Sequence, residues 1–279
     1  MNNNKVWYVT GASQGLGLSL VKQLLAAGYR VAATSRSVAD LQKAVGLADG
    51  DRFLPLPVDL TSADDIRRSI EQTVTTFGTV DVIVNNAGYG MEGTVEELEE
   101  EKMRAIFGIN VFATINVTRY ALPYLRKQRS GHIINIASVA GFVGAPGWSI
   151  YSATKAAVIA FSEVLALDLE GLGIKVTVVG PSGFRTGFLT KNSLVSVESQ
   201  IADYQSVAST RARYAAMNGK QDGDPEKAAA LFIRLAEDPE PPLHLWLGAN
   251  ALDRASEKIE SLGEELQKWK DLSISADFK

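Results

Sequence analysis

The sequence contains no cysteine and only two histidines, and these two scarcities exclude several kinds of chemistry. Without cysteine the chain can form no disulfide, no thiolate nucleophile and no cysteine-ligated metal site. His132 and His244 lie in separate strand-like runs and lack the spacing of a metal-ligand pair. We therefore expect a protein that depends on neither disulfides, nor thiol catalysis, nor a bound metal.

The sequence also lacks a strong charge imbalance and a long uninterrupted hydrophobic run. Its net charge of -4 gives no basic surface for nucleic acid or for an anionic membrane. The N-terminal residues, MNNNKVWYVTG, enter a strand-like run without the apolar core of a signal peptide. The longest apolar stretch, 156–167, is interrupted by Ser162 and Glu163, and we expect it to be too short to span a bilayer. These features predict a soluble, cytoplasmic protein that binds neither nucleic acid nor membrane.

Strand-like and helical patterns alternate along most of the 279 residues. The helical patterns cover 16–28, 38–46, 63–78, 101–127 and 151–171. The alternation predicts an α/β protein with a doubly wound Rossmann fold, in which helices cover both faces of a seven-stranded parallel sheet. No linker or change in composition divides the chain, so we expect one domain over residues 1–279. The predicted strands are 5–10, 30–35, 52–59, 80–86, 131–138, 174–180 and 243–248.

A glycine-rich segment, TGASQGLG (10–17), connects the first predicted strand to the first predicted helix. Doubly wound sheets bind ligands at the carboxyl ends of their strands, which is where this segment lies. Gly11, Gly15 and Gly17 permit a tight turn and let backbone N–H groups approach a pyrophosphate at the helix N-terminus. This position indicates a nucleotide-binding loop, although the spacing is G-x-x-x-G-x-G and not the common G-x-G-x-x-G.

This glycine spacing resembles that of the short-chain dehydrogenase/reductase family, and further motifs follow in the family's order over about residues 5–190. One departure is Ser182, which stands where glycine is usual, although Gly183 follows and no catalytic group is removed. The matching residues are Asp59 after the third strand, NNAG (85–88) after the fourth, Asn110 in the long helix, Ser138 after the fifth strand, YSATK (151–155) at the start of a helix, and PSGFRT (181–186) after the sixth strand.

The resemblance implies a catalytic tetrad of Asn110, Ser138, Tyr151 and Lys155. Tyr151 and Lys155 are four residues apart and share one helix face. A Lys ammonium ~4 Å away would lower the tyrosine pKa from about 10 by roughly 3 units, so we expect Tyr151 to exchange a proton near neutral pH. Ser138 would hydrogen-bond the substrate oxygen, and Asn110 would hold a water that links Lys155 to solvent.

Each member of this tetrad also has a purely structural alternative. Ser138 could cap a turn, and Asn110 could be a buried amide satisfied by the backbone. Tyr151 and Lys155 alone could form an amphipathic helical turn, with Tyr151 half buried and Lys155 in water. These alternatives are plausible singly, but the cofactor motifs favour the catalytic interpretation of all four together.

The resemblance implies a nicotinamide dinucleotide, and the segment TSRS (34–37) bears on which one. An acidic residue at the end of the second strand would bind the adenosine ribose hydroxyls and repel a 2′-phosphate, but this position holds Ser35. Arg36 follows, and its guanidinium suits a phosphate; a solvated arginine is the alternative. Gln14 stands where many NADP-preferring relatives carry a base, so only one cation is evident. We expect NADP(H), with NAD(H) as the alternative.

The same resemblance implies which residues bind this dinucleotide. They are Gly11, Ser13, Gln14, Gly15, Leu16, Gly17, Ser35, Arg36, Asp59, Leu60, Asn86, Ala87, Gly88, Tyr151, Lys155, Pro181, Gly183, Phe184 and Thr186.

The predicted function is hydride transfer between the nicotinamide and a ketone or secondary alcohol, with Tyr151 as acid and base. One alternative is a catalytically idle dinucleotide-binding sensor or scaffold, which an intact tetrad argues against. The other is a sugar-nucleotide epimerase or dehydratase. Such proteins resemble an extended branch with different glycine spacing and a larger C-terminal substrate domain, which this chain lacks.

Two segments are expected to contact the substrate, which we predict to be apolar and bulkier than a two- or three-carbon alcohol. Residues 139–150 should line the site through Phe142, Pro146 and Trp148, with packing beneath the loop as the alternative. The insertion at about 187–220, called the lid below, should cover it. Its candidate contacts are Phe188, Leu189, Leu194, Tyr204 and Tyr214.

A helical extension is predicted at about 249–272, with Ile259, Leu262, Leu266 and Trp269 on one face. We expect this face to pack on the body of the protein, with a subunit contact as the second alternative. The resemblance implies a homo-oligomer, a dimer or tetramer, formed through the helices at 101–127 and 151–171.

Overall fold

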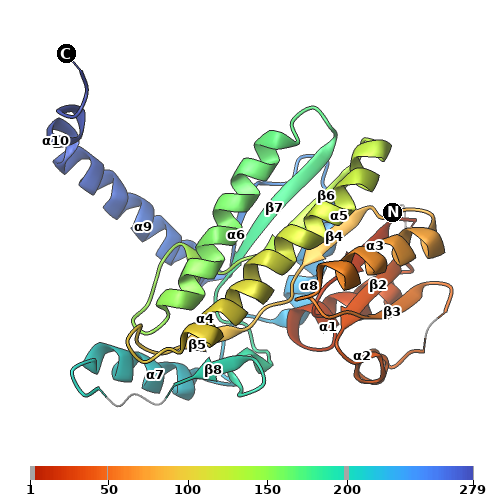
Figure 1. The fold of residues 1–279 in the computed structure, drawn as a ribbon, viewed down its shortest axis with the longest axis horizontal. Helices are drawn as coiled ribbons and strands as arrows, with labels where there is room; N and C mark the ends of the chain where they lie inside the picture. Colours follow the sequence, from red (N-terminus) through yellow and green to blue (C-terminus); the bar gives the residue numbers. More distant parts are fainter. Residues whose placement is uncertain (1–3, 49, 198–200, 279) are drawn as a thin grey trace.

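A seven-stranded parallel sheet forms the centre of the protein, with helices on both faces (Figure 1). The structure, a computed structural model, describes residues 4–48, 50–197 and 201–278. The strand order is β3-β2-β1-β4-β6-β7-β9, and every neighbouring pair is parallel. The predicted fold class is therefore confirmed. The strands are β1 (Val6–Val9), β2 (Arg30–Ser35), β3 (Phe53–Pro57), β4 (Val82–Asn85), β6 (Gly131–Ile136), β7 (Ile174–Pro181) and β9 (His244–Leu247).

The strand order reverses between β1 and β4, and this reversal decides where a ligand can bind. The chain runs outward from β1 to β2 and β3, and then returns to place β4 on the other side of β1. In the register of this pair, Val9 lies beside Val84, so the loops that follow the two strands leave the sheet together. Ligands of open α/β sheets bind at such a point.

The alternation of side chains along each strand divides the core into two layers. On β1, Trp7 and Val9 face one layer, and Val6 and Tyr8 face the other. The first layer is covered by α1 (Gly15–Ala26), α2 (Val38–Val45) and α8 (Pro225–Glu237). The second is covered by α3 (Ala63–Phe77), α5 (Ala113–Gln128) and α6 (Ser149–Asp168).

Helix α8 is not predicted from the sequence, although its start carries a recognisable signal. Asp224 accepts hydrogen bonds from the backbone N–H groups of Glu226 and Lys227, and Pro225 occupies the first turn. The helix is held against α1 by Gln23, whose Nε2 lies 2.7 Å from Glu226 Oε2. Its apolar face, with Phe232 fully buried, completes the first core layer.

The long helix expected at 101–127 is interrupted. It consists of α4 (Glu100–Phe107), one π-helical turn at Gly108–Phe112, and α5. Such a turn inserts an extra residue into the helix and is common at functional sites. Here it contains Asn110 and turns that side chain into the interior, where it is 1% exposed.

Two short strands outside the main sheet are also unpredicted. β5 (Gly90–Glu92) follows the NNAG motif, and it pairs in parallel with β8 (Leu194–Ser196) from the lid. The lid continues through α7 (Gln205–Met217), and its residues 198–200 lie outside the described part. The lid is therefore tied to the body by backbone pairing near its start.

The expectation that the apolar stretch 156–167 is too short to span a bilayer is wrong, because this stretch is part of a longer apolar helix. Helix α6 and the continuous helical segment 100–128 are both long and apolar enough to do so, by length and composition alone. Both pack against the sheet, and α6 buries Val158, Ile159 and Leu165. Core helices of a sheet protein have this composition too.

The C-terminal helix α9 (Ala249–Lys268), followed by the short α10 (Lys270–Ile274), projects from the body (Figure 1). Only its first turns pack on the protein, through Ala251 and Ala255. Ile259, Leu266 and Trp269 are exposed. The expectation that this face packs on the body is therefore wrong, because the helix direction set at Gly248 carries it away from the sheet.

We predict that His132 makes the protein acid-sensitive. Its Nε2 lies 2.9 Å from Thr177 Oγ1, and burial lowers its pKa to about 4. The folded state thus disfavours the protonated ring, so this stability is complete above pH 6.5, the unfolded value, and is lost as the pH falls towards 4. We expect a loss of about 2 kcal/mol in the free energy of unfolding at pH 5.

Denaturant unfolding at pH 7.5 and pH 5 measures this difference. His132→Gln should lose about 2 kcal/mol less than the wild type between the two pH values. His244→Gln keeps His132 and should keep the full loss. An equal pH dependence in the wild type and His132→Gln would contradict the prediction.

Candidate active site

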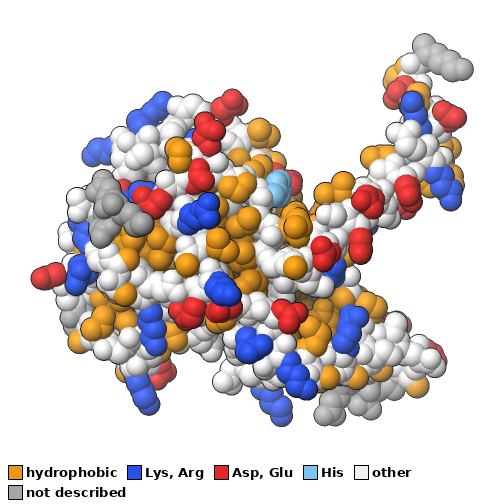
Figure 2. All heavy atoms as spheres, turned by 180° about the vertical axis from the view of Figure 1, so that it is seen from behind, with side chains coloured by type: hydrophobic (Ala, Val, Ile, Leu, Met, Phe, Trp, Pro, Cys, Tyr) orange, Lys and Arg blue, Asp and Glu red, His pale blue; other side chains and the backbone are white. Residues whose placement is uncertain are grey.

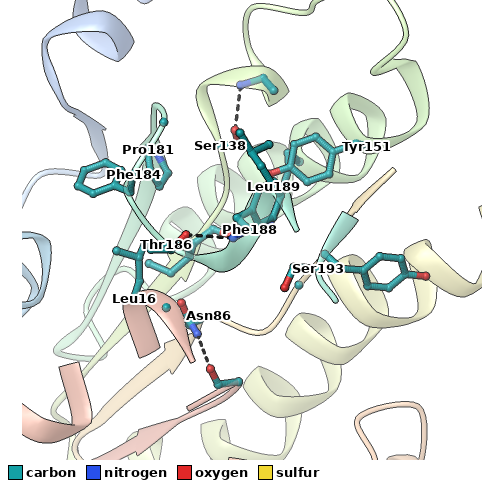
Figure 3. Close-up of a pocket in the computed structure, with 18 of the residues that line it drawn as sticks. Leu16, Asn86, Ser138, Tyr151, Pro181, Phe184, Thr186, Phe188, Leu189 and Ser193 are labelled. Carbon is teal, nitrogen blue, oxygen red and sulfur yellow. Dashed lines mark hydrogen bonds between the residues drawn. The ribbon is translucent and has the colours of Figure 1, made fainter. Parts of the chain in front are cut away.

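A cavity of about 940 Å³ opens at the carboxyl edge of the sheet, where the loops after β1 and β4 diverge. The carboxyl ends of β1, β2, β3, β4, β6 and β7, the start of α6 and the lid all contribute to its wall. Figure 3 shows part of this lining. Every residue predicted to bind the dinucleotide lines it except Gly17, which lies beneath the loop. Ser138 also lines the cavity, but Asn110 does not.

The glycine loop lies so close to the β4 loop that side chains are excluded from two of its positions. A Cβ on Gly11, which has a φ of +64°, would lie 2.8 Å from Ala87 Cα. A Cβ on Gly17 would lie 2.5 Å from Asn86 Nδ2 and 2.6 Å from the Gly11 oxygen. These glycines are therefore required by contact between the two loops as well as by turn geometry.

Thr10 and Asn86 brace the two loops against each other. The backbone N–H groups of Asn86 and Ala87 both donate to Thr10 Oγ1 at 3.0 Å. In return, the Asn86 side-chain amide donates to the carbonyl oxygens of Thr10 and Gly11, at 2.9 and 3.1 Å (Figure 3). These hydrogen bonds tie the end of β1 to the end of β4.

The start of α1 is suited to an anion. No side chain caps it, because Gln14, at the capping position, makes no bond to the helix backbone. The N–H groups of the first turn therefore face the cavity without a side-chain partner, as a pyrophosphate site requires. Gln14 Nε2 instead donates to Ser193 Oγ of the lid at 2.9 Å. The residues fit a dinucleotide.

Tyr151 lies in the first turn of α6 and is packed among aromatic rings. The ring centroids of Trp148 and Phe188 lie 5.4 and 5.8 Å from its own. Burial raises its pKa to about 12, while a side-chain hydrogen bond with Ser138 lowers it and Tyr214 adds a smaller increase. Tyr151 therefore holds its proton at neutral pH.

Lys155 lies one turn further along α6 and is buried as well. Its Nζ donates to the Ile136 carbonyl oxygen at 2.8 Å and lies 5.9 Å from the centre of the Tyr151 ring. Burial lowers its pKa to about 8. The lowering of the Tyr151 pKa that we expect from the sequence is wrong for this structure, because burial of the phenol raises that pKa instead.

Ser138 lies beside Tyr151 in the wall of the cavity (Figure 3). It follows β6 and caps the short 3-10 turn Val139–Gly141, where its Oγ accepts from Ala140 N at 3.1 Å. Ser138 therefore caps a turn, as the structural alternative predicts, and also lines the cavity, as a substrate contact would. The cap fixes the rotamer that aims the hydroxyl at Tyr151.

Asn110 clamps the backbone of the NNAG loop. Its Oδ1 accepts from Tyr89 N, and its Nδ2 donates to the Tyr89 oxygen and to Thr154 Oγ1, each at 3.0 Å. A Cβ on Gly88 would lie 3.0 Å from Asn110 Oδ1 and 3.4 Å from Lys155 Nζ. Asn110 therefore sits directly behind the catalytic pair, as the buried, backbone-satisfied amide of the structural alternative.

Apolar and aromatic side chains line the part of the cavity next to the Tyr151 hydroxyl. Of the expected contacts, Pro146, Trp148, Phe188, Leu189 and Tyr214 line it. Trp148 joins the two sides, since its ring centroid lies 5.0 Å from that of Tyr214 and 5.4 Å from that of Tyr151.

Three expected substrate contacts lie elsewhere. Phe142 stacks on Trp246 at 5.1 Å, because its loop turns back onto β9. Leu194 packs beside the Gly90 backbone in the small sheet. Tyr204 is half-exposed at the rim, where its hydroxyl donates to Glu96 Oε2 at 2.8 Å.

Several lining residues are missed by sequence reasoning. Asn250 and Arg254 reach the cavity from α9, and no local pattern marks them. Arg213 and Gln221 come from the far part of the lid. A buried ion pair, 2.7 Å between Arg211 Nε and Glu92 Oε1, holds α7 on β5 and is equally unmarked in the sequence.

The departure at Ser182 is accommodated by a second glycine. A Cβ on Gly248 would lie 2.6 Å from Ser182 Oγ, so the added hydroxymethyl group occupies the space that Gly248 leaves open. The Ser182 N–H donates to the Leu247 oxygen at 3.0 Å. The loop therefore keeps its attachment to the edge strand.

Known proteins have the same fold and a similar sequence. A model of the short chain dehydrogenase family matches residues 5–194. Oxidoreductase BOA17 of Botryotinia fuckeliana is 34% identical over 98% of this chain and 99% of its own. A short-chain dehydrogenase from Streptomyces avermitilis is 37% identical, with a TM-score of 0.90 over 98% and 99% of the two chains. A Burkholderia phymatum enzyme in complex with NAD shares the fold, with a TM-score of 0.81 over 95% and 97% of the chains and 21% identity.

We predict that Asn110→Ala destabilises the protein. The substitution leaves the buried N–H and carbonyl groups of Tyr89 without their partner, at a cost of about 2 kcal/mol in the free energy of unfolding. Denaturant unfolding measures this cost, and Asn192→Ala, at an exposed lid position, should leave stability unchanged. An unaltered midpoint and slope in Asn110→Ala would show that the clamp contributes nothing.

Proposed function

The chain belongs to the short-chain dehydrogenase/reductase family, and we propose that it reduces an apolar ketone with NADPH or oxidises the corresponding secondary alcohol. As a member of this family it is an NAD(P)-dependent oxidoreductase. The observation that carries the proposal is that Ser138 and Tyr151 lie side by side in the wall of one cavity that also contains the glycine cradle. A binding module would need the cradle alone.

Tyr151 acts as the proton donor in the proposed reduction. A nicotinamide dinucleotide held by the glycine cradle would supply the hydride, which would leave negative charge on the carbonyl oxygen of the substrate. Ser138 donates a hydrogen bond to that oxygen, and Tyr151 transfers its proton to it. The raised pKa of Tyr151 keeps this proton in place until the stronger base, the alkoxide, forms.

Lys155 stabilises the phenolate that remains on Tyr151. Its pKa of about 8 leaves the ammonium group mostly protonated at neutral pH. An ammonium beside a phenolate in a buried site is worth several kcal/mol, which offsets the desolvation that otherwise disfavours the ionised tyrosine. Asn110 supports both residues by holding the backbone at Gly88 and Tyr89.

The lining of the cavity supports an apolar substrate. Trp148, Phe188, Leu189 and Tyr214 surround the Ser138 and Tyr151 hydroxyls. A ketone with hydrocarbon on either side of the carbonyl could place its oxygen against the Ser138 and Tyr151 hydroxyls and its hydrocarbon against these apolar side chains. The test is a panel of ketones, aldehydes and secondary alcohols, with both dinucleotides, followed at the nicotinamide absorbance. The absence of turnover across the panel would favour a dinucleotide-binding sensor.

The end of β2 supports NADP(H). Ser35 and Arg36 line the cavity, and Arg36 is exposed, without a hydrogen bond or ion pair in the described part of the chain. Asp59 lies across from it, with a pKa lowered chiefly by its hydrogen bonds with Thr61 and least by Arg36. A guanidinium in this position suits the 2′-phosphate of NADP(H). NAD(H) is the alternative, since no second cation adjoins it in the glycine loop.

Exposed apolar side chains support a homo-oligomer. Phe112, Val164 and Leu167 are all more than half exposed, on the outer faces of the π-helical turn and α6. Isolated apolar residues are common on surfaces, but those on α6 lie on one outward face, as a subunit contact requires. We propose a dimer or tetramer formed through this face.

We predict that Tyr151→Phe lowers turnover by about 10³-fold, because only the proton donor is removed. Dinucleotide affinity should change little, since the ring and its packing remain. Tyr214→Phe, which removes a hydroxyl from the same cavity, is the matched control and should retain most activity. Steady-state kinetics and a dinucleotide titration measure the two effects. A Tyr151→Phe enzyme with more than about a tenth of the wild-type rate would exclude Tyr151 as the acid.

We predict a preference for NADP(H) over NAD(H) of about ten- to a hundredfold in kcat/KM, because one to two charge-assisted hydrogen bonds are at stake. Arg36→Ala should erase most of this preference, and adding Ser35→Asp should reverse it. Arg254→Ala removes a cation from the opposite part of the cavity and should leave the ratio unchanged. Equal efficiency of the wild type with both dinucleotides would contradict the prediction.

A further inference from the structure

The projecting helix α9 presents an apolar stripe that no described part of the chain covers. Leu252, Ile259 and Leu266 are spaced seven residues apart and are 56%, 58% and 73% exposed. Leu262 and Trp269 form a parallel row three residues further on, and Trp269 is 51% exposed. A helix of 20 residues is about 30 Å long, and this one leaves the body after its first turns (Figure 2).

The seven-residue spacing is that of a coiled-coil seam. Two rows offset by three residues, each repeating every seven, place apolar side chains on one narrow face of a helix. Such a face is buried by a second helix of the same kind. The stripe also lies apart from the α6 face proposed for oligomerisation, and it does not depend on the catalytic function.

We propose that α9 pairs antiparallel with α9 of a second copy of this chain. In that register Ile259 lies opposite Leu262 of the partner, and Leu252 lies opposite Trp269, so that each row meets the other row. Leu266 then comes to the end of the exposed stripe, next to the junction at which the buried Ala255 packs the partner's helix on its body. The seam is thus complementary to itself.

The charges along the seam select this orientation. Lys258 and Glu265 flank one edge of the stripe, and neither forms an ion pair in the described part of the chain. In the antiparallel register Lys258 faces Glu265 of the partner, and the pair occurs twice. In a parallel register Lys258 would instead face Gly263. The antiparallel pairing alone satisfies both charges within α9.

The other edge of the stripe is made of small residues. Ser256 and Gly263 lie there, and nothing lies within 4 Å of the position that a Cβ on Gly263 would take. A glycine within a helix is unfavourable unless close approach requires it. Opposite Ser256 of the partner, Gly263 lets the two backbones come near on this edge.

Single cysteines test the register, because the chain has none of its own. An equimolar mixture of Ile259→Cys and Leu262→Cys full-length proteins should form a disulfide-linked dimer under mild oxidation, seen on a non-reducing gel. Either variant alone should cross-link far less. Glu260→Cys, on the outer face of α9, controls for random collision.

Charge exchange tests the contact independently. Lys258→Glu alone and Glu265→Lys alone should each weaken assembly about tenfold in Kd, because like charges then face each other. The double variant Lys258→Glu with Glu265→Lys should restore the wild-type Kd to within about threefold. Sedimentation over a range of concentrations measures these values, and circular dichroism checks that each variant is folded. None of these residues lines the active-site cavity, so dinucleotide binding should be unchanged.

The proposal fails on either of two results. Cross-linking of the mixture at or below the Glu260→Cys control, or of each single variant with itself, excludes the antiparallel pairing. An assembly that is equally strong in the wild type and both single charge variants excludes α9 as the contact. Oligomerisation through α6 would persist in that case, which separates the two interfaces.

Discussion

The contact between the loops after β1 and β4 is the constraint on which the site depends. Four hydrogen bonds join Thr10 and Gly11 on one side to Asn86 and Ala87 on the other. Gly11 and Gly17 are required there because the contact leaves no room for a side chain. Because β1 and β4 lie at the reversal of strand order, this contact joins the two halves of the sheet. It holds the glycine loop against the loop after β4. The next residues of that loop are Gly88, which lies beside Lys155, and Tyr89, whose backbone is bound by Asn110. The glycine loop and the surroundings of Lys155 are thus joined through direct contacts.

Burial sets the protonation of Tyr151 and Lys155. The raised pKa of Tyr151 and the lowered pKa of Lys155 both arise from the loss of water around them. Each shift favours the neutral form, but at neutral pH Tyr151 is neutral whereas Lys155 remains mostly protonated. An ionised Tyr151 becomes favourable only when charge develops beside it, which suits a group that gives up its proton late in the reaction.

The sequence predicts the sheet and the cofactor wall because those features are local. Runs such as VWYV and the glycine spacing of 10–17 report strand and loop directly, and almost every predicted cofactor residue lines the cavity. Long-range features are not visible in this way. The direction in which α9 leaves the body, the turn of Phe142 onto Trp246, and the pairing of β5 with β8 are decided by segments distant in sequence. The pKa of Tyr151 is likewise set by total burial, which no motif reports.

The hydrogen bond between Gln14 and Ser193 gives the glycine loop and the lid a shared contact. If a bound dinucleotide favours one position of the lid, then a lid held in that position must raise the affinity for the dinucleotide by the same factor. A substrate that holds the lid down would then slow the escape of the cofactor, and a cofactor in place would help to retain the substrate. The Gln14 amide would then couple two ligands that do not touch each other.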